Sequence, residues 1–246
     1  MFTIFDYPIK KITLFFEYIG QYLMLMTKMF RSVDSWHKYT SNIVDQMIII
    51  GSKSIPIVII TSFFSGMVTS VQGAYQMTTT LVPKWYIGGI VGETVILELA
   101  PMITGLVLAG RVGANIAAEI GTMRVTEQID ALETLSIDPV AYLIVPRVLS
   151  GLVMFPVLVI IADFFGIFGG LVACLTTLDI NSYQFVKGLK SWFNPWDAVF
   201  GLIKAFHFGF YTTGGAQGVG KSTMNTVVAS CVTIVIIDYL LAELLL

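Results

Sequence analysis

The sequence predicts an all-α integral membrane protein, with an N-terminal interfacial helix, about five transmembrane helices and a cytoplasmic helical segment. Composition is the first observation: 56% of the 246 residues are hydrophobic and 12% are charged. With a mean hydropathy of +0.82, too few polar side chains are present to cover a soluble globule of this length. The second observation is the recurrence of apolar stretches of roughly twenty residues, which is the length that crosses a hydrocarbon core of about 30 Å as a helix.

The N-terminal residues 9–30 are predicted to form a helix that lies in the membrane surface. Their apolar side chains recur at steps of three and four among charged and amide side chains: Ile12, Phe15, Phe16, Ile19, Leu23, Met26 and Phe30. This spacing is typical of an interfacial helix. The alternative, a first spanning helix, is weaker because Glu17 and Gln21 would lie near its middle. Residues 31–54 are polar, and their aromatic side chains suit the headgroup level.

Five stretches are predicted to cross the membrane: 55–77, 86–110, 142–176, 197–213 with its flanks, and 224–246. The stretch 142–176 is longer than one span requires. We therefore expect it to be tilted, bent near Pro156 or extended beyond the bilayer. Together the five stretches predict a single transmembrane domain over residues 1–246.

The distribution of basic residues predicts the orientation. With the N-terminus inside, only Lys84, Lys187 and Lys190 lie outside, whereas the remaining predicted loops and ends are rich in cations. The cytoplasmic set is Lys10, Lys11, Lys28, Arg31, Lys38, Lys53, Arg111, Arg124, Arg147 and Lys221. Cytoplasmic loops of membrane proteins carry such an excess. The segment 113–139 is therefore predicted to be cytoplasmic, and the loop 178–196 to face the periplasm, with Trp192 and Trp196 as anchors and enough length for a short surface helix.

Several function classes lack support in the composition. The net charge of −2 offers no basic face for nucleic acid, so no nucleic-acid partner is expected. Cys174 and Cys231 both lie inside apolar runs, where a buried thiol is the ordinary interpretation. We predict no metal site and no cofactor.

The cytoplasmic segment 113–139 is the longest polar stretch between two apolar ones. Its apolar side chains Val125, Ile129, Leu132 and Leu135 recur at helical spacing, whereas Glu119, Glu127, Asp130 and Glu133 take other faces. Thr126 is predicted to cap a helix whose first turn contains Glu127, favourably placed at the positive end of the helix dipole. Two interpretations are equally supported by these residues: a plain interfacial helix, or a rigid element that docks on a separate subunit.

Residues 215–222, GAQGVGKS, match the phosphate-loop pattern through Gly215, Gly220, Lys221 and Ser222. A working phosphate loop follows a buried strand and opens a helix, and it needs a separate acidic strand for magnesium. Here the motif lies between two predicted membrane spans. We therefore predict a glycine-rich cytoplasmic turn that binds no nucleotide.

Two ionisable residues stand out inside the predicted spans, Glu98 and Lys204. Opposite charges near the middle of the membrane on different helices either offset each other's desolvation as a salt bridge or line a wet cavity. Both alternatives remain open at this point.

The pattern ELAP…LAGRVGA…AAEIGTMRVTEQIDAL, beginning at Glu98, resembles the core signature of the MlaE-type (YrbE-like) permeases. These are the membrane subunits of ABC transporters that move lipids in double-membraned bacteria and chloroplasts. The resemblance is dense over residues 92–150 and looser from about 50 to 246. It implies a non-catalytic permease subunit that moves phospholipid across a bacterial inner membrane. It also implies a homodimer with cytoplasmic ATPase subunits and a periplasmic MCE-type lipid-binding protein.

The resemblance implies that the segment 113–139 docks on the ATPase, with Glu119, Thr126, Glu127 and Asp130 as coupling candidates. A second group of candidates follows from the cost of charges inside a span, which requires that Glu98 and Lys204 pair or face water. The candidates for a lipid cavity are Glu98, Lys204, Leu97, Pro101, Phe208 and Tyr211, in which Lys204 attracts a lipid phosphate and the apolar neighbours receive acyl chains. The first alternative is a secondary transporter that couples protons through Glu98, Asp163 or His207. The least supported is an intramembrane lipid enzyme, because no paired metal-ligand set or Ser/His dyad falls in one predicted pocket.

Overall fold

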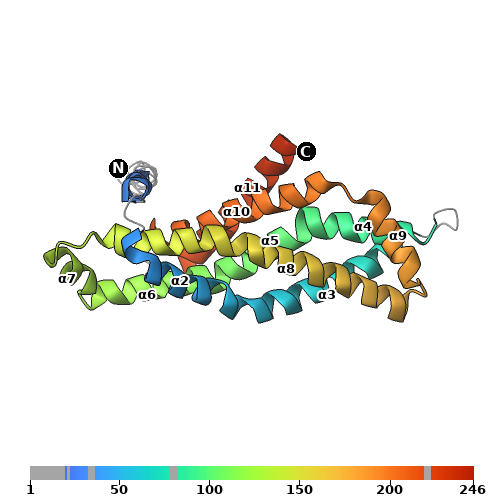
Figure 1. Ribbon diagram of the computed structural model, residues 1–246, viewed down its shortest axis with the longest axis horizontal. Coiled ribbons are helices and arrows are strands. Elements are labelled where there is room, and N and C mark those ends of the chain that lie inside the picture. The colour runs from blue at the N-terminus through green and yellow to red at the C-terminus, as the bar shows by residue number, and fades with distance from the viewer. Residues whose placement is uncertain (1–19, 21–22, 33–36, 78–82, 219–222) are drawn as a thin grey trace, which may run out of the picture.

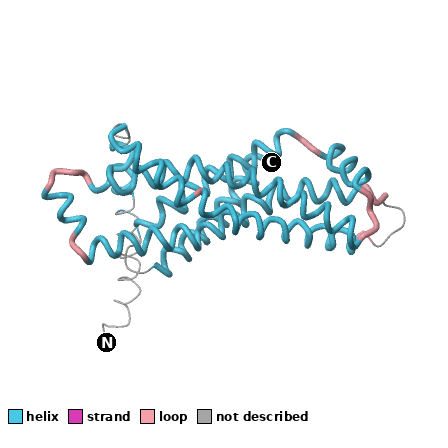
Figure 2. The backbone as a smooth tube through the Cα atoms, turned by 60° about the horizontal axis from the view of Figure 1, so that its bottom comes forward, coloured by secondary structure: helices cyan, strands magenta, loops and turns pink. Residues whose placement is uncertain are grey.

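The computed structural model describes residues 20, 23–32, 37–77, 83–218 and 223–246. Within these residues the chain forms helices joined by turns, and no strand. The helices make an elongated bundle, with the short helix α7 at one end and α9 at the other (Figure 1). Figure 2 shows from a second side that the loops gather mainly at these two ends.

The predicted all-α membrane fold is confirmed. Four helical stretches in the described part of the chain are long and apolar enough to cross a membrane: His37–Gln76, Tyr86–Val125, Val140–Thr177 and Thr226–Leu245. They contain four of the five predicted spans. The fifth, 197–213, lies in α10 (Pro195–Gly218), a helix of 24 residues. Asp197, Lys204 and His207 make α10 less apolar than the other four stretches.

The helical stretch that contains the first predicted span begins before that span, at His37. Helix α2 (Thr40–Ile50) and the short 3-10 turn η2 (Ser52–Ser54) lead directly into α3 (Ile55–Gln76). The polar stretch 31–54 therefore contains a helix that its composition did not indicate. Ile43 and Ile50 are the buried residues of α2. The Ser150 hydroxyl also donates a hydrogen bond of 2.8 Å to the carbonyl oxygen of Ile43, so tertiary contacts stabilise this helix.

The second stretch is one long helix interrupted by two π-helical turns. It consists of α4 (Tyr86–Thr94), η3 (Val95–Leu99), α5 (Ala100–Leu108), η4 (Ala109–Gly113) and α6 (Ala114–Val125). Glu98 lies in the first π turn and Arg111 in the second. Such turns insert an extra residue into a helix and frequently mark functional positions. A third π turn, η5 (Val140–Ile144), precedes α8 (Val145–Thr177).

Helix α8 forms the central packing partner of α3. It has 33 residues and continues through Pro156, so at 1.5 Å per residue it is roughly 50 Å long. This length exceeds one hydrocarbon core, as the sequence predicts. Gly66 of α3 contacts the backbone of Gly166, and the Ser70 hydroxyl donates a hydrogen bond of 3.0 Å to the carbonyl oxygen of Gly170. Small residues therefore allow the two backbones to approach closely, as is usual between membrane helices.

The loop 178–196, which is long enough for a short helix, contains α9 (Ser182–Trp192). The Asn181 side chain accepts a hydrogen bond of 2.8 Å from the backbone N–H of Gln184 and so caps the helix. The Trp192 ring packs edge-on against Tyr86, with 5.5 Å between ring centroids. The chain then continues through α10 into α11 (Thr223–Leu245).

The described part of the N-terminal segment, 23–32, is helical and runs across the long axis of the bundle (Figure 1). Met26 and Met29 pack with Val145 and Val148 at the start of α8. This direction is the one that a helix in the membrane surface takes beside upright spans. Most of the predicted interfacial helix 9–30 lies outside the described residues.

Candidate functional site

Lys204 lies at the centre of a charged cluster within the bundle. Its ammonium nitrogen is 2.8 Å from Glu98 Oε1 and 2.8 Å from Asp238 Oδ1. It also donates a hydrogen bond of 3.0 Å to the carbonyl oxygen of Leu97. The Lys204 side chain is fully buried, whereas that of Glu98 is 41% exposed and that of Asp238 is 13% exposed. One cation therefore joins three parts of the chain: η3, α10 and α11.

The local sequence of η3 explains why a carbonyl oxygen is available to Lys204. Pro101 has no N–H and cannot donate to the carbonyl oxygen four residues earlier, which is that of Leu97. The Lys204 ammonium has three N–H donors, and two of them are used in hydrogen bonds to Glu98 Oε1 and to the carbonyl oxygen of Leu97. Asp238 Oδ1 lies within ion-pair distance but accepts no hydrogen bond in the described structure. The Phe200 ring, whose centroid is 4.6 Å from the nitrogen, adds a cation–π contact.

The structure brings together Glu98, Lys204 and Leu97, three of the six predicted cavity residues. Pro101 and Phe208 are buried, and a side chain added at Gly105 would meet the Phe208 ring. In this conformation they are parts of the packed core. Tyr211 is half-buried. Within the charged cluster, the side chain of Glu98 is therefore the one that is mainly accessible from outside the bundle.

Asp238 is the member of the cluster that sequence reasoning did not assign. Its signal is a lone carboxylate in the middle of the last apolar stretch, which predicts some interhelical partner but not which one. Asp163 and His207, the other polar candidates, form no ion pair with the cluster. One carboxylate oxygen of Asp163 is buried without a hydrogen-bond partner in the described structure. His207 Nδ1 lies 2.8 Å from the carbonyl oxygen of Ile203 in its own helix.

Glu119, one of the predicted coupling residues, has a structural partner. Its Oε1 lies 2.9 Å from Arg147 Nη2, and the Arg147 side chain is only 3% exposed. Arg147 also donates a hydrogen bond of 2.8 Å to the carbonyl oxygen of Leu143. The carboxylate therefore compensates a buried charge at the junction of α6 and α8.

The predicted cap at Thr126 is wrong. Helix α6 continues to Val125, and the Thr126 hydroxyl donates a hydrogen bond of 2.9 Å back to the carbonyl oxygen of Thr122. The chain then turns at Glu127, whose φ of 58° lies in the left-handed region. Helix α7 begins one residue later and covers Gln128–Thr134. The segment is therefore two helices joined by an elbow, which we call the α6–α7 elbow.

The GAQGVGKS stretch does not follow a strand. Gly215 to Gly218 form the last residues of α10, which ends at Gly218. The rest of the motif up to Ser222 lies outside the described residues. A phosphate loop needs a strand before its first glycine. The helix that precedes Gly215 here is therefore inconsistent with nucleotide binding by this motif.

The fold and the charged cluster define a multi-pass helical membrane protein with a polar centre inside the bundle and the α6–α7 elbow at one end. The family model described as permease MlaE matches residues 43–244. The chain therefore belongs to the MlaE permease family.

Curated relatives agree with this assignment. A probable ABC transporter permease protein of Rickettsia prowazekii is 43% identical, and the match covers 84% of this chain and 83% of the relative. A probable ABC transporter permease protein of Synechocystis is 42% identical over 83% of this chain and 81% of its own. The chloroplast protein TRIGALACTOSYLDIACYLGLYCEROL 1 of Arabidopsis thaliana is 35% identical over 82% of this chain and 61% of its own. The names of the two bacterial relatives support an ABC transporter permease.

Proposed function

We propose that this chain is the membrane-spanning subunit of an ATP-driven phospholipid transporter in a bacterial inner membrane. It works as a homodimer with cytoplasmic ATPase subunits and a periplasmic MCE-type lipid-binding protein. The named relatives support the ATP-driven mechanism. The family and the Arabidopsis relative, which is named after a galactolipid, support a lipid substrate.

The observation that carries the proposal is the surface of the α6–α7 elbow. Val125 is 85% exposed and Leu135 is 69% exposed. The acidic side chains of Glu127, Asp130 and Glu133 are exposed beside them. The elbow lies at the end of the bundle, beyond the membrane-spanning stretch that ends at Val125 (Figure 1). Arg124, next to Val125, is the one exposed basic residue of the elbow within the described residues. Large apolar side chains that the fold leaves uncovered, together with a mainly acidic surface, are typical of a docking surface for another protein.

Co-expression tests this part of the proposal. The full chain, with an affinity tag, is expressed together with the neighbouring reading frames, and the complex is purified in mild detergent. We expect an ATPase subunit to co-purify and two copies of this chain to be present by native mass spectrometry. A chain that purifies alone and moves a labelled phospholipid in response to a proton gradient would support the secondary-transporter alternative instead.

The charged cluster supports a lipid path with one change to its expected mechanism. As found, one lysine and two carboxylates give the cluster a formal charge of −1, so it does not attract a phosphate. The Lys204 ammonium lies against both carboxylates, and Glu98 is its more exposed partner. We infer that a lipid phosphate reaches Lys204 by displacing the Glu98 carboxylate, while Asp238 keeps its contact.

A charge reversal separates this role from a purely structural one. A protein with both Glu98→Lys and Lys204→Glu keeps an ion pair between these two positions, but it places a new carboxylate beside Asp238. The informative protein therefore combines the exchange with Asp238→Asn, and Asp238→Asn alone is the control. A structural cluster predicts that the triple variant regains stability and transport. A lipid site predicts regained stability without transport, because the cation now lies on η3 and not on α10.

A further inference from the structure

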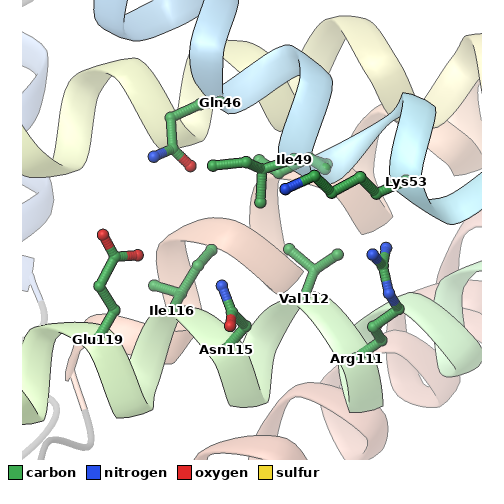
Figure 3. A pocket seen from close by; sticks show the side chains of 9 residues that line it. Gln46, Ile49, Lys53, Arg111, Val112, Asn115, Ile116 and Glu119 are labelled. Carbon is green, nitrogen blue, oxygen red and sulfur yellow. The ribbon is translucent and has the colours of Figure 1, made fainter.

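A polar cavity lies away from the Lys204 cluster, between the first two membrane-spanning stretches. Its volume is about 330 Å³, at the lower end of the range for small-molecule sites. α2 and η2 form one wall, and η4 with α6 forms the other (Figure 3). The lining side chains are those of Gln46, Ile49, Ile50, Lys53, Arg111, Val112, Asn115, Ile116 and Glu119.

Two basic side chains, those of Lys53 and Arg111, line one end of this cavity. Among the residues that the structure describes, neither Lys53 nor Arg111 is within ion-pair distance of a carboxylate. Arg111 donates one hydrogen bond to the Ser54 hydroxyl, which in turn donates to the carbonyl oxygen of Ile50 at 2.5 Å. Ser54 is fully buried, so this chain of hydrogen bonds fixes the guanidinium. A guanidinium has five N–H donors, and within the described part of the chain only the hydrogen bond to Ser54 uses one of those of Arg111.

The single acidic side chain of the lining does not neutralise these cations. The Glu119 carboxylate is bound to the buried Arg147 at 2.9 Å. In Figure 3 it lies opposite Gln46, at the other end of the cavity from Lys53 and Arg111. The amide group of Asn115 points into the space between the two ends. The end with Lys53 and Arg111 is therefore suited to an anion that accepts several hydrogen bonds.

The position of the cavity favours a lipid as the source of this anion. Helix α3 starts two residues after Lys53 and, at 22 residues, is roughly 33 Å long. It therefore fills the hydrocarbon core, and Lys53 lies at the level of the headgroups. Exposed apolar side chains continue from Lys53 along α3 at helical spacing: Ile57, Ile60, Phe64, Val68 and Val71. This stripe offers an acyl chain a path that begins at the cation.

We propose that this cavity binds the phosphate group of a phospholipid from the cytoplasmic leaflet, with Lys53 and Arg111 as the phosphate ligands and Asn115 as an additional donor. The site is separate from the Lys204 cluster and does not require that lipid is transported. It rests on the orientation proposed above, in which the end of the bundle with Arg111 is cytoplasmic. Arginine suits this role because its fork of donors matches phosphate oxygens.

Photo-crosslinking of the purified full chain in nanodiscs tests the site. The probe is a phosphatidylglycerol with a photoactivatable group near the headgroup, in a phosphatidylcholine membrane. A diacylglycerol that carries the same group but lacks phosphate is the comparison. We expect the phosphate-bearing probe to label peptides of α2 and α6, and the diacylglycerol to leave them unlabelled. Labelling of both peptides by the two probes to the same extent would overturn the proposal.

Charge-removing variants test the ligands. The double variant Lys53→Gln, Arg111→Gln should reduce labelling by the phosphate-bearing probe about tenfold, because two charge-assisted hydrogen bonds are lost. Lys53→Gln alone changes an exposed side chain and should reduce labelling by a smaller factor without loss of folding. Lys84→Gln, an exposed lysine at the other end of the bundle, is the control and should not change it. Unchanged labelling in Lys53→Gln and in the double variant would overturn the proposal.

Inorganic phosphate separates the two sources of the anion. Inorganic phosphate is added to the original protein before the lipid probe. If it prevents labelling of the α2 and α6 peptides only at great excess over the probe, the lipid is the ligand. If the protein in detergent binds inorganic phosphate through Lys53 and Arg111 but gives no lipid crosslink, the cavity is a site for free phosphate and the lipid proposal is overturned. None of these measurements uses transport or an ATPase, so their outcome does not depend on the proposed function.

Discussion

The Lys204 ammonium lies 2.8 Å from Asp238 Oδ1, so an ion pair joins α10 to α11 inside the bundle. Because Lys204 is also bound to Glu98, removal of this one cation leaves two carboxylates without their partner. Breaking a buried ion pair in this way typically costs about 3–5 kcal/mol. We expect Lys204→Met to lower the unfolding temperature of the purified protein markedly.

Removal of all three charges gives the contrasting result. In the triple variant Glu98→Gln, Lys204→Met and Asp238→Asn, no charge remains uncompensated, so most of the lost stability should return. The measurement is thermal unfolding in the same detergent, followed by size-exclusion chromatography. A triple variant that is as unstable as Lys204→Met would show that packing of the lysine stem, and not its charge, stabilises the contact.

Close packing of α3 on α8 gives a second prediction. A methyl group at Gly66 would overlap the carbonyl oxygen of Gly166. Because the obstacle is backbone, the two helices must move apart, and such overpacking costs about 1–3 kcal/mol. Gly66→Ala should therefore unfold at a lower temperature than the original protein.

Gly121 provides the matched control for this prediction. It lies in α6, and a methyl group there meets nothing within 4 Å. Gly121→Ala should leave stability unchanged or raise it by about 0.5–1 kcal/mol, because alanine loses less backbone entropy in a helix. If both substitutions changed the unfolding temperature equally, the small side chain at Gly66 would have no special role in packing.

The span positions were predictable because apolar length is a local property of the sequence. Glu98 and Lys204 were also recognisable, since each is a charge within an apolar run. The role of Asp238 was not recognisable, because its contact with Lys204 depends on how α10 and α11 pack. Helix α2 was missed because the charged and hydroxyl side chains before Ile43 and after Ile50 made the stretch 31–54 polar as a whole, although most residues of α2 from Ile43 to Ile50 are apolar. Thr126 illustrates a local ambiguity: its hydroxyl can cap a following helix or bond back to the preceding turn, and the left-handed Glu127 selects the second.

The orientation of the bundle gives a third prediction. Single cysteines are introduced at Ser182 and Asn194 near α9, and at Glu133 in α7, in a chain that carries Cys174→Ala and Cys231→Ala. All three positions are exposed, so access to reagent depends on the side of the membrane. The excess of basic residues predicts that α9 is outside and α7 inside.

An impermeant thiol reagent added to intact cells should modify the first two cysteines and not the third. Permeabilised cells, in which all three should react, provide the control for folding and expression. Labelling of the Glu133 position alone in intact cells would reverse the orientation, and with it the cytoplasmic placement of the Arg111 cavity.

Asp138 makes the contact between the N-terminal segment and α8 depend on pH. Partial burial raises its pKa, but the backbone N–H of Val140 and the Lys28 ammonium outweigh burial and hold the pKa of Asp138 below its ordinary value of 3.8. The Lys28 nitrogen lies 3.2 Å from Asp138 Oδ1, and the Ser32 hydroxyl donates to Oδ2 at 3.1 Å. A carboxylate with a depressed pKa contributes stability that is fully present above its unfolded pKa and is lost as pH falls through the folded value.

We therefore expect the segment 23–32 to stay docked above pH 4 and to loosen below it. Amide hydrogen exchange of this segment, corrected for the intrinsic rate at each pH, measures the change. Asp138→Asn should show the faster exchange already at neutral pH and little further change on acidification. An identical pH response in the original protein and in Asp138→Asn would assign the effect to another group.

The α6–α7 elbow gives the last prediction, which separates coupling from stability. Glu127 and Asp130 are exposed and make no side-chain ion pair within the described structure. Reversing both to lysine should leave the unfolding temperature of the permease unchanged but release the ATPase, because like charges or altered geometry then meet at the dock. Glu119→Ala is the matched comparison, since Glu119 compensates the buried Arg147. It should lower stability by about 1–2 kcal/mol, moderated by the exposure of Glu119 to solvent. Co-purification and thermal unfolding of the two proteins measure both properties. Full ATPase binding by the Glu127→Lys, Asp130→Lys protein would remove these two residues from the proposed dock.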